Sequence, residues 1–203
     1  MKIFIKKLED KEPHGKEERA AFRQAAYLFM LECIKSIGID IKSGGCETPA
    51  EGDSRLQAAE DPVIRPFAKD SLGKPFLPGH PEVVFNLSHC RNGDAAVAAA
   101  MSGEAAAGGI DVERRIPYQD ALARKICSDA EAGALRQAET EEERESLLGL
   151  FWSRKEAILK CRGTGIRSPL SMVDTLHIDK KRYYMVEKQT EDYTLVVCME
   201  RAR

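Results

Sequence analysis

The chain has 203 residues, enough for one domain or two small halves whose core needs no disulfide or metal to fold. Its 31 Lys and Arg nearly balance its 33 Asp and Glu, and a net charge of −2 excludes a protein that holds nucleic acid by bulk charge. No apolar run approaches the roughly 20 residues of a membrane helix, and the N-terminus has no apolar signal segment. None of the six cysteines forms a CxxC pair, so we expect reduced, mostly buried thiols in a cytoplasmic protein.

Hydrophobic periodicity and turn residues predict the elements of the first half. In chain order these are a strand, a helix, a polar mobile loop, an irregular segment and a two-stranded hairpin, at residues 1–8, 17–37, 42–62, 70–81 and 83–101. In the predicted helix, apolar residues recur every three or four positions until Gly38 ends the pattern. The hairpin rests on the turn Asn92-Gly93-Asp94 between two apolar runs.

The second half is predicted to contain a strand, three helices and a closing hairpin, at residues 108–113, 118–127, 129–137, 141–161 and 183–199. Both halves therefore hold a helix and later close with a hairpin. This echo suggests a duplicated α+β unit of roughly 100 residues. Many unrelated α+β domains also end in hairpins, and the sequence alone leaves the two explanations equal.

Two acidic residues lie two apart in the strand Gly-Ile-Asp-Val-Glu at 109–113. Because alternate residues of a strand share a face, Ile110 and Val112 should point into the core while Asp111 and Glu113 point together the other way. Neighbouring carboxylates repel unless a cation lies between them, and Mg²⁺ prefers oxygen ligands. On its own, however, this pattern is more often the solvated face of an edge strand.

A third carboxylate lies in the predicted helix Trp-Ser-Arg-Lys-Glu-Ala-Ile-Leu-Lys at 152–160. Trp152, Glu156 and Lys160 are spaced i, i+4, i+8 and share one stripe. A carboxylate beside Lys155 and Lys160 suits a metal-bound pyrophosphate, with Glu156 on the cation and the lysines on phosphate oxygens. An ordinary surface helix with a Glu–Lys pair has the same pattern.

The segment Phe-Asn-Leu-Ser-His at 85–89 follows Gly-Lys-Pro-Phe at 73–76. A Lys, a Ser and a His this close in sequence make an anion site plausible. Ser88 and His89 are adjacent in a strand and should face opposite sides unless the strand ends there. No G-x-S-x-G elbow surrounds Ser88, which argues against a serine hydrolase.

The four motifs GKPF, FNLSH, GIDVE and WSRKEAILK occur in this order, and together they resemble the 4′-phosphopantetheinyl transferases of the surfactin-synthetase-activating (Sfp-like) type. The resemblance runs from about residue 73 to residue 165. It implies an enzyme that transfers the phosphopantetheine arm of coenzyme A to a serine of an acyl or peptidyl carrier protein and releases 3′,5′-ADP.

The resemblance also implies roles for particular residues. It implies that Mg²⁺, with Mn²⁺ as an alternative, is held on the pyrophosphate by Asp111, Glu113 and Glu156. Glu156, Lys160 and Asp111 would be catalytic, with Glu156 as general base for the attacking serine. Coenzyme A would be bound by Lys74, Ser88, His89, Lys155, Lys160 and Arg23, the last with Arg19 as its substitute.

The implied fold is α+β, with two similar halves related by pseudo-two-fold symmetry and an active-site cleft between them. We place the halves at 1–104, which would bind the nucleotide end of coenzyme A, and 105–203, which would hold metal and pyrophosphate. Because both sets of motifs lie on one chain, we expect a monomer without nucleic-acid or membrane partners. The alternatives are an inactive module that binds coenzyme A or carrier, and a Mg²⁺-dependent nucleotide pyrophosphate hydrolase.

Overall fold

The structure is a computed structural model of the whole chain, in which the described residues are 1–8, 15–39, 67–90, 94–101, 103–167 and 169–202. The polar loop predicted at 42–62 and most of the turn predicted at 92–94 lie outside the described residues. All five described cysteines are buried, as the sequence predicted. No helix in the described ranges combines the length and the apolar character needed to cross a membrane.

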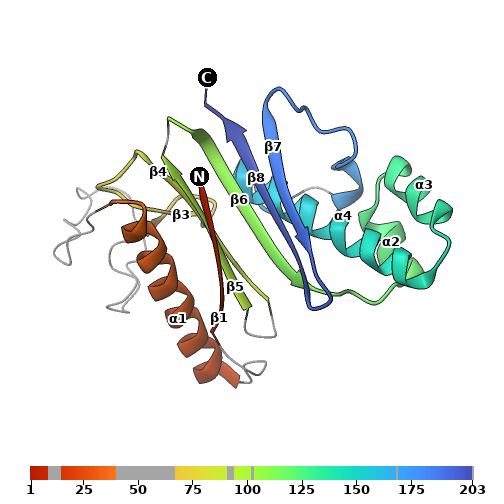
Figure 1. Cartoon of the computed structure of the whole chain (residues 1–203), viewed down its shortest axis with the longest axis horizontal. Coiled ribbons are helices and arrows are strands. Elements are labelled where there is room, and N and C mark those ends of the chain that lie inside the picture. The colour runs from red at the N-terminus through yellow and green to blue at the C-terminus, as the bar shows by residue number, and fades with distance from the viewer. Residues whose placement is uncertain (9–14, 40–66, 91–93, 102, 168, 203) are drawn as a thin grey trace.

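A three-stranded antiparallel sheet with one helix on its face forms the first half (Figure 1). The sheet has the order β1-β5-β4, and the helix is α1. The bounds in this half are β1 Lys2–Lys7, α1 Gly15–Ser36, β2 Ala68–Lys69, β3 Pro75–Phe76, β4 Val83–His89 and β5 Asp94–Met101. Apolar residues of α1 such as Met30 and Ile34 pack on Phe85 of β4. The three- and four-residue spacing predicted part of this face: Phe29 and Cys33 are buried in it, whereas Leu28 is 46% exposed.

The second half also has a three-stranded antiparallel sheet, with the order β6-β8-β7. The long helix α4 covers one face of this sheet, and two short helices lie beyond its N-terminal part (Figure 1). The bounds are β6 Ala105–Arg114, α2 Asp120–Ile126, α3 Asp129–Gln137, α4 Glu141–Arg162, the 3-10 turn η1 Leu170–Met172, β7 Tyr183–Gln189 and β8 Tyr193–Arg201. The predicted helices and both predicted hairpins are confirmed, with boundaries shifted by a few residues.

The two halves share one strand order. In each, the first strand is followed by the main helix and then by a hairpin, and the last strand lies in the middle of the sheet. This confirms the α+β class. The exact boundary between the halves and their separate roles stay predictions.

The two sheets share a core built from small side chains on one side and large ones on the other. Ala96 and Ala100 of β5 pack with Ile110 of β6 and with Val197 and Met199 of β8. Alanine is a weak strand former, but its short side chain lets the two sheets approach closely. The alanine-rich strand is therefore explained by packing between the halves.

Helix α4 also lies unusually close to β6. A Cβ atom on Gly109 would come within 2.1 Å of the Ala157 carbonyl oxygen and 2.3 Å of the Cys161 nitrogen. Only glycine fits there, because both contacts are with backbone atoms. The helix begins at the N-cap Thr140 and ends at Gly163, whose φ of 68° is the left-handed conformation common at helix ends. These features place the motif of α4 directly against the motif of β6.

Candidate active site

The acidic strand alternates as its sequence predicted. Ile110 and Val112 belong to the core shared by the two sheets, whereas Asp111 points toward α4. Asp111 is only 5% exposed, so it does not lie on the solvated face of an edge strand. A buried carboxylate needs partners, and these come from both halves of the chain.

Two side chains from two other elements meet Asp111 of β6. The Lys160 ammonium on α4 donates to Asp111 Oδ1 at 2.8 Å and to Ser88 Oγ at 3.0 Å. The Ser88 hydroxyl on β4 in turn donates to Asp111 Oδ1 at 3.1 Å. The structure thus brings together residues that the sequence separates by up to 72 positions. This junction is where the first half meets the acidic strand and the long helix.

The second oxygen of Asp111 has no hydrogen-bond partner within the described part of the chain. Asp111 Oδ2 is buried and accepts no hydrogen bond from the described residues. Glu156 lies close by: burial raises the pKa of its carboxyl, and the charges of Asp111 and Glu113 raise that pKa further, while Lys160 opposes them. The Glu156 carboxyl therefore lies in the field of two other carboxylates, and one of these, Asp111, has an unsatisfied buried oxygen.

This donor set suits a hard divalent cation. All three side chains offer oxygen, which Mg²⁺ prefers, and a cation would satisfy the orphaned Asp111 Oδ2 and relieve the repulsion felt by Glu156. Within the described ranges, no three acidic, His or Cys side chains converge closely enough to hold a metal ion as they stand. The oxygen ligands of these three residues thus fit a divalent cation, although their side chains would have to change rotamer to bind it together.

A group of cations lies beside this junction. His89 ends β4, and its ring packs edge-on against Phe22 of α1, with centroids 5.2 Å apart and an interplanar angle of 88°. Burial lowers the pKa of His89, and the charges of Lys160 and Arg23 lower it further. His89 keeps an exposed edge even though protein surrounds much of the ring. A histidine that lies in the field of the Lys160 and Arg23 charges is a suitable place for a polyanion.

Lys74 lies elsewhere than the resemblance implied. Its ammonium donates to three backbone carbonyls, those of Gly108 at 3.1 Å, Lys160 at 3.0 Å and Cys161 at 3.3 Å. An ammonium has three hydrogens, so its donors are used. Burial lowers the pKa of Lys74. This lysine ties the GKPF segment to the C-terminal end of α4 and does not present its charge to a ligand.

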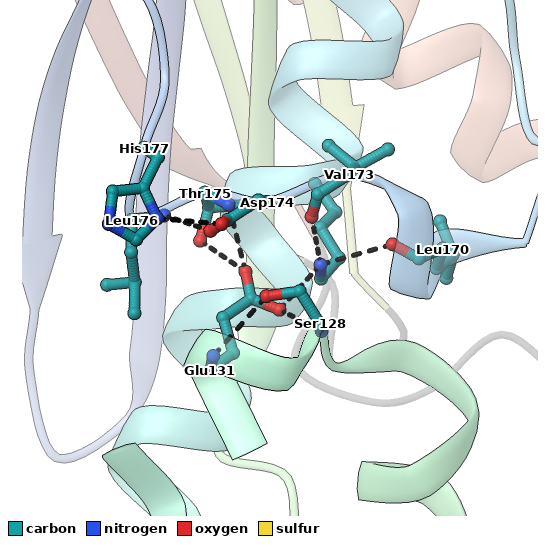
Figure 2. Close-up of polar contacts among 9 residues, drawn as sticks. Ser128, Glu131, Leu170, Val173, Asp174, Thr175, Leu176 and His177 are labelled. Atoms are coloured by element: carbon teal, nitrogen blue, oxygen red, sulfur yellow. Dashed lines mark hydrogen bonds and ion pairs between the residues drawn. The ribbon is translucent and has the colours of Figure 1, made fainter. Parts of the chain in front are cut away.

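Lys155, the second predicted lysine ligand, is buried inside the second half of the chain. Its side chain and that of Glu131 are both 0% exposed, and the two charges pair at 2.6 Å. The Lys155 ammonium also donates to the carbonyls of Leu170 and Val173 (Figure 2). Because its charge is enclosed by protein, Lys155 does not face Asp111 in this structure, and its predicted contact with coenzyme A stays untested.

One residue of the junction was absent from the sequence prediction. Asn86 is buried, and its Oδ1 accepts a hydrogen bond from the Ile110 amide of β6 at 3.1 Å. A signal for it existed: Asn86 and Ser88 are polar residues on one face of an otherwise buried strand. Such residues need buried partners, which the sequence could not identify.

Comparisons with known proteins agree with the motifs. Residues 107–199 match the model of the 4′-phosphopantetheinyl transferase superfamily. A 4′-phosphopantetheinyl transferase of Bacillus subtilis is 29% identical over 150 residues, which cover 68% of this chain and 64% of that protein. The 4′-phosphopantetheinyl transferase Sfp of Bacillus subtilis strain 168 is 32% identical over 114 residues, covering 56% of this chain and 48% of Sfp.

A solved holo-[acyl-carrier-protein] synthase of Thermotoga maritima aligns over 47% of this chain and 63% of its own, with 16% identity and a TM-score of 0.40, a likeness too weak to support an argument. The chain spans between about half and two thirds of the length of the two curated relatives described. The matched region contains α4, which carries Glu156 and Lys160, and the part of β6 that carries Asp111. Over residues 107–199 the chain is thus similar to the 4′-phosphopantetheinyl transferase superfamily, and the curated relatives it resembles include the Sfp type.

Proposed function

We propose that this protein transfers the 4′-phosphopantetheine arm of coenzyme A to a serine hydroxyl of an acyl or peptidyl carrier protein. One observation carries the proposal. The buried Asp111 pairs one oxygen with Lys160 and leaves the other, near Glu156, without a partner among the described residues, in a chain whose residues 107–199 match this superfamily. An unsatisfied buried oxygen disfavours the fold, but it suits a cation and a pyrophosphate.

The nucleotide end of coenzyme A fits the cations at His89. The 3′-phosphate would lie against His89 and Arg23, and Lys160 would reach from Asp111 toward the pyrophosphate. Hydrogen bonds to a charged group contribute about 1.5–3 kcal/mol each. Lys74 and Lys155 take no part in this assignment, because both ammonium groups are enclosed by backbone oxygens or by Glu131.

The proposed reaction moves one phosphoryl group. The serine oxygen forms a bond to the phosphorus that carries the pantetheine, the bond from that phosphorus to the bridging oxygen breaks, and 3′,5′-ADP leaves. Glu156 accepts the serine proton, for which its raised pKa suits it. Lys160 offsets the negative charge that develops on the leaving group. Mg²⁺ held by Asp111, Glu113 and Glu156 would supply further neutralisation of the pyrophosphate.

The decisive experiment is to incubate the chain with coenzyme A, Mg²⁺ and an apo carrier protein and to measure the mass of each product. Transfer raises the carrier mass by one phosphopantetheine and releases 3′,5′-ADP. A pyrophosphate hydrolase would split coenzyme A without any carrier, and a binding module would leave both masses unchanged. Either of these two results would overturn the proposal.

A further inference from the structure

The strand that carries Asp111 has one edge that needs hydrogen-bond acceptors. β6 pairs with β8 on one side only, and its other side faces β4, the edge strand of the first sheet. Ile110 and Val112 are 0% and 1% exposed, so their amides cannot be hydrated. A buried amide without an acceptor is costly, and native structures almost always provide one.

Two side chains of β4 provide these acceptors. Asn86 Oδ1 accepts from the Ile110 amide at 3.1 Å, and Ser88 Oγ accepts from the Val112 amide at 3.2 Å. The acceptors are two residues apart on β4, the donors are two residues apart on β6, and both pairs run in the same direction. Asn86 and Ser88 therefore do with side chains what backbone carbonyls do in a parallel pair of strands.

The Ser88 hydroxyl has no bonding capacity left for a ligand. A hydroxyl can donate one hydrogen bond and accept two. Ser88 Oγ donates to Asp111 Oδ1 and accepts from the Val112 amide and the Lys160 ammonium. These contacts hold the Asp111 carboxylate by Oδ1 and leave Oδ2 without a partner among the described residues.

We propose that Asn86 and Ser88 are positioning residues: they join β4 to β6 across the two halves, and Ser88 in addition sets the orientation of Asp111 and Lys160. The family resemblance implies instead that Ser88 binds coenzyme A, at the nucleotide end that carries the 3′-phosphate. The effect on catalysis rests on the proposed function, whereas the joining of the strands does not. The two parts can therefore be tested separately.

The joining role is tested by amide hydrogen exchange, which requires no activity. Ser88→Ala should speed exchange of the Val112 amide by roughly tenfold or more, and Asn86→Ala should do the same at Ile110. Ser36→Ala is the matched control, because that hydroxyl bonds only locally to the Cys33 carbonyl at 2.7 Å. Unchanged exchange at both amides would overturn the proposal.

A second pair of variants covers the case in which an alanine variant does not fold. Asn86→Asp keeps an oxygen acceptor and should retain the protection of Ile110, and Ser88→Thr keeps the hydroxyl and should retain that of Val112. Equal loss of protection in the conservative and alanine variants would mean that shape, and not hydrogen bonding, joins the strands, and would also overturn the proposal.

The positioning role is tested by comparing coenzyme A with dephospho-coenzyme A as substrates. If Ser88 positions Asp111, Ser88→Ala lowers kcat by the same factor for both substrates and leaves the ratio of their two KM values unchanged. It also raises the Mg²⁺ concentration needed for half-maximal rate. If Ser88 binds the 3′-phosphate, KM rises for coenzyme A only, and the positioning role is wrong. If the wild-type chain transfers nothing, the proposed function fails while the exchange result still decides the joining role.

Discussion

The carboxylate of Asp111 has two oxygens in unlike surroundings. Oδ1 accepts from Lys160 and Ser88, whereas the buried Oδ2 has no partner among the described residues. Leaving a buried polar atom unsatisfied costs free energy of folding, so it persists where a ligand satisfies it in the working state. At the scale of the residue, the candidate site is recognised by this unsatisfied atom.

Removing one carboxylate at a time tests the acidic group. Glu156→Gln should lower the transfer rate by about 10²–10⁴-fold, because it removes a proton acceptor. Asp111→Asn and Glu113→Gln should each reduce transfer sharply, because each removes a charge that the cation needs. Steady-state rates of holo-carrier formation measure all three variants.

The matched control for these variants is Glu142→Gln, which changes an exposed glutamate in the first turn of α4. It should leave the rate near that of the wild type. Near-normal turnover in Glu156→Gln would contradict both roles assigned to that residue, as base and as metal ligand.

His89 allows a prediction about pH. Since the Arg23 guanidinium contributes to its lowered pKa, Arg23→Gln should raise the pKa of His89. Lys35→Gln, at the far end of α1, should leave it unchanged. Titration of the His89 ring by NMR measures both. Addition of coenzyme A should raise the pKa as well, because a phosphate stabilises the imidazolium, and no change on saturation with coenzyme A would place the 3′-phosphate elsewhere.

The lowered pKa of His89 also makes the stability of the fold depend on pH. A histidine whose pKa is lowered in the folded state binds a proton more readily when unfolded. Stability is therefore fully present above the ordinary pKa of about 6.5 and falls as the pH drops from there through the folded pKa. Arg23→Gln should make this loss smaller, as measured by urea unfolding at several pH values.

At the scale of elements, the contact between β6 and α4 depends on one glycine. Gly109→Ala would drive a methyl group into the backbone of α4, which cannot yield as a side chain can. We expect a loss of stability of about 1–3 kcal/mol and a fall in transfer, because Asp111 and Lys160 lie on the two elements that are pushed apart.

The neighbouring glycine provides the control for this prediction. A methyl group on Gly108 would first meet the Met199 side chain, at 2.6 Å from its sulfur, and that flexible thioether can move. Thermal unfolding of the two variants compares them. If Gly108→Ala were as destabilising as Gly109→Ala, the close approach of β6 to the helix backbone would not be the cause.

A second element contact is the buried pair Glu131–Lys155. Glu131 accepts from Thr175 Oγ1 at 2.7 Å and from the Ser128 amide at 2.8 Å, so the pair ties α3, α4 and the segment after η1 together (Figure 2). Glu131→Gln should destabilise the fold by about 3–5 kcal/mol, because it leaves the Lys155 charge buried without a counter-charge. Urea unfolding measures the loss, with the exposed Glu139→Gln as control.

The double variant Glu131→Gln with Lys155→Met distinguishes a structural lysine from a ligand. It should recover part of the lost stability, because no unpaired charge remains buried. Affinity for coenzyme A, measured by calorimetry, should stay near the wild-type value. A strong loss of that affinity in the folded double variant would show that Lys155 does contribute to coenzyme A binding.

At the scale of the whole molecule, both halves contribute to one site within one chain. Ser88 and His89 come from the first sheet, and Asp111 and Lys160 come from the second sheet and its helix. We therefore predict a monomer that binds one coenzyme A, since no second chain is needed to complete the site. Light scattering combined with a coenzyme A titration tests this. A stable trimer, or two molecules bound per chain, would contradict it.

The sequence by itself determined the elements and the type of chemistry. The helix at Gly15–Ser36, the three later helices and both hairpins follow from local periodicity and caps, which act over a few residues. The acidic strand and the Lys-Glu helix could be found because their spacing is local too. Four motifs in order then indicated the superfamily, which the match over residues 107–199 supports.

Only the tertiary structure decided which charged residues face the site. Lys155 and Lys160 lie on one helix about 140° apart around its axis, and the sequence does not say which stripe meets β6 and which meets α3. Packing buries Lys155 against Glu131 and turns Lys160 toward Asp111. Asn86 likewise gained a role only when β6 was placed beside it. The reason is physical: local spacing decides which side chains share a face, but what that face meets depends on distant segments of the chain.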